Sequence, residues 1–193
     1  MNLSLEDRVE AYHANFPHYP NIFLDKGWLM GVWVLGNMYK RTSGYYGAFP
    51  GNFLKRTMSL FPDRNRTLHL FSGTLVAQPG EITLDCQATD LVKPTVVGDA
   101  RKMPFGEASF DFCLADPPYS AKDAANYSTT MPSRRHVMAE IARVMEPGGK
   151  LAWLDTVRPM YRAVEWKQVG AIMVLVSTNT RARCLSIFER RGD

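Results

Sequence analysis

From Thr67 onward, short apolar runs alternate with turns and helical segments, and this alternation limits the possible folds more than any other feature. Strands separated by helices form parallel sheets, whereas the last two runs lie close enough for an antiparallel hairpin. We therefore predict an α/β fold with a doubly wound, mainly parallel sheet of about seven strands, helices on both faces and ligands at the carboxyl ends of the strands. The expected strands are Thr67–Phe71, Ile82–Leu84, Thr95–Val97, Phe110–Ala115, Leu151–Leu154, Gly170–Ser177 and Arg183–Glu189.

Four helices are expected around these strands, whereas residues 21–50 give no clean period and remain unassigned. Asn52 and Ser133 stand where two of the helices begin and are candidate N-caps, while Pro147 stops the second of these. We divide the chain into an N-terminal extension, residues 1–65, and a core, residues 66–193. The expected helices are one within residues 1–20, then Asn52–Leu60, Ser133–Met145 and Val157–Lys167.

The charge of the chain is concentrated in one early segment. The 193 residues carry a formal net charge of +4, and residues 26–66 hold seven basic side chains against one acidic. Cations interleaved with aromatic rings suit a surface that follows a nucleic-acid backbone. Alternatively, the rings belong to the core and the cations form a solvated rim. The rings concerned are Trp28, Trp33, Tyr39, Tyr45, Tyr46 and Phe49.

The cysteines and the apolar runs exclude several classes of protein. Cys86, Cys113 and Cys184 are odd in number and far apart, which argues against a disulfide framework and against a metal site. No apolar run approaches the roughly 20 residues of a membrane-spanning helix, and no apolar signal region opens the chain. We expect a cytoplasmic protein that is not bound to membranes.

The sharpest motif follows the apolar run that ends at Ala115, and it would lie at the mouth of the sheet. A plain rigid turn is the alternative interpretation, because proline fixes its own φ and restricts the residue before it. The position after a buried strand favours a functional site. The motif consists of Asp116, Pro117, Pro118 and Tyr119.

Together with neighbouring motifs, this tetrapeptide resembles the class I S-adenosylmethionine-dependent methyltransferases, specifically those that modify adenine N6 or cytosine N4 in DNA. The resemblance spans roughly residues 49–190 and implies a Rossmann-like fold, an N-methyltransferase and S-adenosylmethionine as cofactor. The other matching stretches are Gly98–Phe105, Ser109–Asp111 and Glu146–Gly149.

The chemistry that the resemblance implies explains the tetrapeptide. An exocyclic amine is a poor nucleophile because its lone pair is delocalised into the base. The Asp116 carboxylate and the Pro117 carbonyl would accept its two N–H groups, Pro118 would stiffen the backbone, and Tyr119 would stack on the base. In a duplex the target base would first be flipped out of the stack.

The resemblance also implies a cofactor site on the first strands. Gly73 would let the backbone approach the methionine part, Asp85 would bind the ribose hydroxyls, and Asp99 would accept from the adenine amino group. Two departures stand out: Leu75 replaces a second glycine, and only 12 positions separate Gly73 from Asp85, which leaves little room for the usual first helix. The expected cofactor residues are Phe71, Ser72, Gly73, Thr74, Asp85, Asp99 and Ala100.

The segment Phe49–Arg56 resembles the family's final motif, which packs beside the cofactor in circularly permuted members; a plain amphipathic helix is the alternative. The expected activity is methylation of an exocyclic amino nitrogen of a nucleic-acid base, with DNA adenine N6 favoured. RNA bases, a glutamine amide and a degenerate, non-catalytic binding protein are the alternatives. We expect DNA rather than RNA as partner, with a possible homodimer or specificity subunit.

Overall fold

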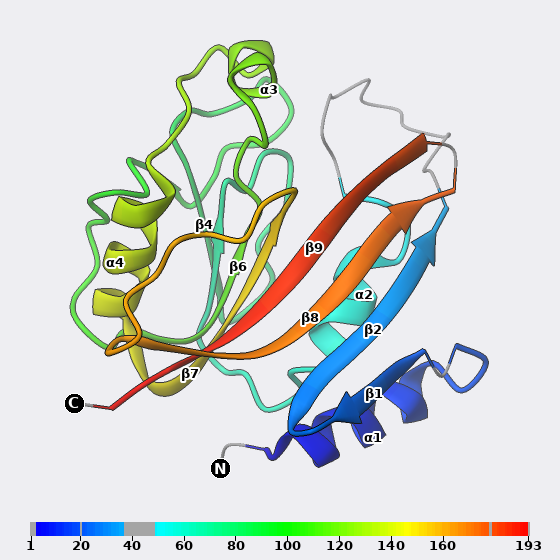
Figure 1. Cartoon of the computed structure of the whole chain (residues 1–193). Coiled ribbons are helices and arrows are strands. Elements are labelled where there is room, and N and C mark those ends of the chain that lie inside the picture. Colours follow the sequence, from blue (N-terminus) through cyan, green and yellow to red (C-terminus); the bar gives the residue numbers. More distant parts are fainter. Residues whose placement is uncertain (1–2, 20, 37–48, 178, 193) are drawn as a thin grey trace.

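A computed structural model describes residues 3–19, 21–36, 49–177 and 179–192. The strands form one nine-stranded sheet in the order β1-β2-β8-β9-β7-β6-β3-β4-β5 (Figure 1). Its members are β1 (Ile22–Asp25), β2 (Trp28–Leu35), β3 (Thr67–Leu70), β4 (Glu81–Asp85), β5 (Val96–Val97), β6 (Phe110–Ala115), β7 (Met145–Asp155), β8 (Trp166–Val176) and β9 (Asn179–Arg190).

The pairing confirms the predicted architecture. β5, β4, β3, β6 and β7 pair in parallel, and β9 pairs antiparallel with both β7 and β8. The C-terminal hairpin of β8 and β9 is therefore inserted beside the parallel part of the sheet. All the parallel strands end at the same edge, where a ligand site is expected.

Helices cover both faces of the sheet, as predicted (Figure 1). α4 (Arg134–Val144) packs Val137, Met138 and Ile141 onto one face. α1 (Leu5–Asn15) and α2 (Phe53–Ser59) pack onto the other face through Tyr12 and Phe53. The short α3 (Ala121–Asn126) follows β6. Among the described residues, no helix is long and apolar enough to cross a membrane.

β1 and β2 extend the sheet beyond the seven strands that the sequence predicts. In β2 every second residue is buried, but the exposed positions, including Val32 and Val34, are apolar as well. Because both sides of β2 are apolar, its sequence lacks the alternation of polar and apolar residues that would predict a half-buried strand. The division of the chain at residues 65 and 66 remains a prediction, although β1 and β2 belong to the same sheet as the core strands.

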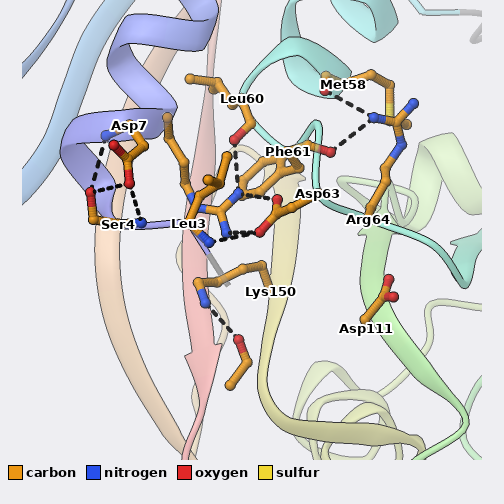
Figure 2. Close-up of polar contacts among 12 residues, drawn as sticks. Leu3, Ser4, Asp7, Met58, Leu60, Phe61, Asp63, Arg64, Asp111 and Lys150 are labelled. Carbon is orange, nitrogen blue, oxygen red and sulfur yellow. Dashed lines mark hydrogen bonds and ion pairs between the residues drawn. The ribbon is translucent and has the colours of Figure 1, made fainter. Parts of the chain in front are cut away.

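An ion pair fixes α1 to the loop before β3 (Figure 2). The Arg8 guanidinium, only 1% exposed, donates to Asp63 Oδ1 at 2.7 Å and Oδ2 at 2.8 Å and to the Leu60 carbonyl at 3.0 Å. The Leu3 backbone N–H also donates to Asp63. The hydrogen bonds to both charges offset part of the cost of burying the Arg8 guanidinium.

The prediction of a helix over Val157–Lys167 is wrong. Residues 157–165 form an irregular crossover with a turn, and β8 begins at Trp166. Pro159 disfavours helical backbone before it, and the Trp166 indole N–H donates to the Met138 carbonyl of α4, which fixes the strand instead.

Three details of the expected helix ends also differ. Asn52 occupies the N-cap of α2, but it has a φ of 64° and its side chain makes no capping hydrogen bond; Ser133 likewise precedes α4 without capping it through its side chain. α4 gives way directly to β7 at Met145, and Pro147 lies inside that strand, where the register with β6 shifts.

Candidate active site

The tetrapeptide motif begins directly after β6, at the carboxyl edge of the sheet, as its sequence position predicts. The Tyr119 hydroxyl donates to Asp116 Oδ1 at 2.6 Å, so one carboxylate oxygen already has a partner. Burial raises the pKa of the Asp116 carboxyl to about 7, and burial also holds the pKa of Tyr119 well above its usual value. Near neutral pH, therefore, Asp116 changes between acceptor and acid while Tyr119 stays a donor.

Two arginines of β9 lie against the Tyr119 ring. The guanidinium carbons of Arg181 and Arg183 are 5.1 Å and 5.3 Å from the ring centroid. Arg181 also pairs with Asp123 of α3 at 3.0 Å. The charge of Arg183 lowers the pKa of Asp116, which opposes the larger effect of burial. Sequence reasoning missed both arginines.

The ion pair between Arg134 and Asp155 contacts the backbone of the motif. Asp155, fully buried at the end of β7, accepts from Arg134 Nε at 2.7 Å, and the other end of the Arg134 fork reaches the Tyr119 carbonyl at 3.4 Å. The Trp153 indole N–H donates to the same carboxylate. This network, also missed from the sequence, ties the start of α4 to the backbone of the tetrapeptide.

The predicted cofactor residues lie at the ends of β3 and β4. Gly73 donates its backbone N–H to Asp85 Oδ2 at 2.8 Å, which places the turn after β3 against the last residue of β4. Phe71 and Gly73 have φ values of 58° and 52°, a conformation that glycine adopts without a steric penalty but phenylalanine does not. As the short spacing to Asp85 indicated, residues 71–80 contain no helix.

Asp99 lies near the exposed rim, where Arg101 holds its carboxylate. Arg101 Nη2 donates to Asp99 Oδ2 at 2.7 Å, and these hydrogen bonds lower the pKa of Asp99. The adjacent Ala100 is buried, and both Ala100 and Gly98 line the cavity. The proposed acceptor role of Asp99 thus has to operate beside a bound guanidinium.

All eleven predicted site residues line one cavity of about 1170 Å³. A site for one small ligand typically measures about 300–1,000 Å³, so this cavity has room for a cofactor and part of a substrate. Phe49, Gly51 and Lys55, from the segment before and within α2, also line it, as expected for a motif that packs beside the cofactor. The roles of the individual residues remain predictions.

The basic N-terminal segment is only partly a surface. Trp33 is fully buried, and Arg56, 4% exposed, stacks on the rings of Phe16, Tyr19 and Trp33. Trp33 therefore belongs to the core, as the alternative interpretation holds, whereas Trp28 is 41% exposed and Arg56 is a buried cation rather than part of a solvated rim. Lys55 is exposed on the cavity side of α2. Tyr39, Tyr45 and Tyr46 lie outside the described residues.

Comparisons with known proteins agree with this fold. Residues 79–153 match a family described as a methyltransferase domain. TrmN from Thermus thermophilus has 18% identity and a TM-score of 0.53 over 75% of this chain and 50% of TrmN, so the chain spans about half the length of that protein. The N-methyltransferase NodS from Bradyrhizobium japonicum WM9 has 12% identity and a TM-score of 0.48 over 67% of this chain and 87% of NodS. No curated protein sequence matches the chain.

The matched segment contains Asp85, Asp99 and Asp116 and covers β4, β5, β6 and most of β7, whereas β3 and Gly73 lie before it. Residues 79–153 thus resemble a methyltransferase domain, and the fold is one that methyltransferases share. The site fits S-adenosylmethionine, because a polar turn at Gly73 and the Asp85 carboxylate face a cavity with apolar walls such as Leu84 and Val97.

Proposed function

We propose that this enzyme transfers a methyl group to an exocyclic amino nitrogen of a nucleic-acid base, with adenine N6 of DNA as the first candidate. The observation that carries the proposal is the position of Asp116–Tyr119 at the end of β6, in the same cavity as Gly73 and Asp85. A hydrogen-bond acceptor for an amine thus shares one cavity with the expected cofactor turn.

The residues of the motif have separable tasks. Asp116 and the Pro117 carbonyl accept the two N–H groups, which localises the nitrogen lone pair, and the two prolines keep these acceptors in place. S-adenosylmethionine supplies the electrophilic methyl group when bound. The methylated nitrogen then carries one proton too many. Asp116, whose pKa lies near 7, can take that proton and release it to water.

Cations around the cavity support an anionic substrate. Lys55, Arg101, Arg181 and Arg183 all line it, and they approach from α2, the rim beyond β5 and the start of β9; Arg101 and Arg181 are also ion-paired with Asp99 and Asp123. Arginines bind phosphates through paired N–H groups, and their planar guanidiniums also stack on bases. The cluster formed by Tyr119 with Arg181 and Arg183 therefore offers a flat, cationic platform next to the Asp116 carboxylate.

Labelled methyl transfer to separate pools of DNA, RNA and protein tests the proposal. We expect label in DNA, loss of transfer in Asp116→Ala with retained S-adenosylhomocysteine binding, and normal transfer in the matched control Asp90→Ala, which changes an exposed carboxylate. Asp85→Ala should instead weaken S-adenosylhomocysteine binding. Label in RNA or on a glutamine amide would show that DNA is not the substrate. Cofactor binding without transfer to any pool would indicate a non-catalytic binding protein.

A further inference from the structure

The solvent side of β2 is apolar along its whole length. Trp28, Met30, Val32 and Val34 are 41%, 38%, 45% and 60% exposed, and they alternate with buried residues. An antiparallel or edge strand with one open face normally carries polar side chains there. Four consecutive apolar positions on an open strand face are therefore an unusual exposure of hydrophobic surface.

The neighbouring strands continue this surface. Phe23 of β1 pairs with Met30, and Met173 of β8 pairs with Val32, so these side chains lie on the same side of the sheet. Phe23 is 51% and Met173 is 42% exposed. We call the six exposed side chains the open face: Phe23, Trp28, Met30, Val32, Val34 and Met173.

The same side of the sheet is covered elsewhere. α4 packs over the strands around β7, and Tyr161 of the crossover packs on Phe188 of β9, with ring centroids 5.0 Å apart. Beyond the crossover, no helix among the described residues lies over β8, β2 and β1 on this side, whereas α1 and α2 cover the opposite side (Figure 1). The open face is therefore the one large part of the described sheet that lacks a packing layer.

The size of the open face fits a protein interface. The six side chains are 38–60% exposed and together offer on the order of 500 Å², within the roughly 300–600 Å² of the largest patch on a typical monomer. A standard interface buries about 800 Å² on each partner, so the open face would supply more than half of one and its rim the rest. Isolated surface hydrophobics would not reach this area.

The chemistry of the open face indicates what covers it. Its six side chains are uncharged, the exposed Asp25 opposite Trp28 adds a negative charge at one end, and a nucleic acid would need cations there. A flat apolar strip is complementary to a copy of itself, because two sheets pack face to face through interdigitating apolar side chains. Arg181 and Arg183 alternate with Cys184, the pairing partner of Met173, so they point to the opposite side of β9.

We propose that the open face is the interface of a homodimer in which the β1–β2–β8 faces of two copies pack together about a twofold axis. The occupant is a second copy of this chain. The dimer covers the missing layer of each sheet, whereas the cavity lies at the carboxyl edge of the parallel strands. The proposal does not depend on which base, if any, the enzyme methylates.

Sedimentation equilibrium of the full chain across micromolar concentrations tests this proposal. We expect a dimer, and a dissociation constant raised at least about 100-fold in the double variant Met30→Lys/Val32→Lys, in which like charges would face one another. The matched control Leu91→Lys changes an exposed apolar side chain in a distant loop and should leave dimerisation unchanged. A wild-type monomer at all concentrations would overturn the proposal, as would a dimer that the double variant does not weaken.

Two further variants separate the interface from folding. Val32→Thr/Val34→Thr keeps β-branched side chains and should weaken the dimer while the circular dichroism spectrum stays native. Mixing the lysine variant with Met30→Glu/Val32→Glu should restore a dimer, now a heterodimer, through opposite charges. Failure of that mixture to associate, with both variants folded, would also contradict a face-to-face homodimer.

Discussion

The Tyr119 hydroxyl and the Asp116 carboxylate are joined by a hydrogen bond of 2.6 Å within the cavity. This bond lowers the pKa of Asp116, although burial dominates and raises it to about 7. If the ionised carboxylate accepts the substrate N–H, kcat/KM rises with pH through about 7. In Tyr119→Phe the pKa of Asp116 goes up, so this rise shifts to higher pH. Methyl-transfer rates across pH 5 to 9 check the shift. A profile that is the same in Tyr119→Phe and in the wild type would show that Asp116 is not the titrating group.

Asp116 also makes the folded state sensitive to pH. Its pKa is about 7 in the folded protein against 3.8 for an ordinary aspartate, so the folded state holds the proton more tightly. The free energy of unfolding therefore decreases as pH rises from about 4 to about 7. Asp116→Asn cannot ionise, and we expect its Tm to exceed that of the wild type at pH 8 but not at pH 4. An equal difference at both pH values would contradict this linkage.

The Arg8–Asp63 pair predicts a large loss of stability when only one partner is removed. In Asp63→Ala the Arg8 guanidinium stays buried without its counterion, which costs about 3–5 kcal/mol. Arg8→Met/Asp63→Leu removes both charges and should recover much of that loss. Urea unfolding measures both values. The interpretation fails if the double variant is less stable than Asp63→Ala.

A close backbone contact between β2 and β8 restricts Gly170. A Cβ added there would lie 2.6 Å from the Leu29 carbonyl oxygen, whereas one added at Gly36 would meet nothing within 4 Å. Gly170→Ala should therefore destabilise the protein by about 1–3 kcal/mol, and Gly36→Ala should be nearly neutral. Thermal unfolding of the two variants compares the sites directly, and equal effects would argue against the contact.

The sequence predicts the parallel part of the sheet well, because each of its strands has a local apolar run. The same logic brings Gly73, Asp85 and Asp116 together, since residues that follow parallel strands meet at one edge. β1 and β2 escape prediction for a specific reason. β1 has only four residues, and the solvent side of β2 is as apolar as its buried side, whereas a pattern of polarity reports burial only when water faces polar groups.

The charged residues around Tyr119 are harder to predict from the sequence. Arg181 and Arg183 lie far from Tyr119 in the sequence, and only the insertion of β9 brings them to its ring. Their period-two spacing in the C-terminal hairpin is the one available signal that both point to the same side. Nothing local links Arg134 to Asp155, because that pair depends on how α4 packs against β7.

The position of β9 has a consequence for folding. β9 is the last in chain order of the nine described strands, yet it lies between β7 and β8 and holds β1-β2-β8 to the other five strands. Until β9 is in place, the sheet consists of two unjoined parts with exposed edges. Arg181 and Arg183 reach the cavity only with β9, so the same step joins the sheet and completes the lining of the cavity.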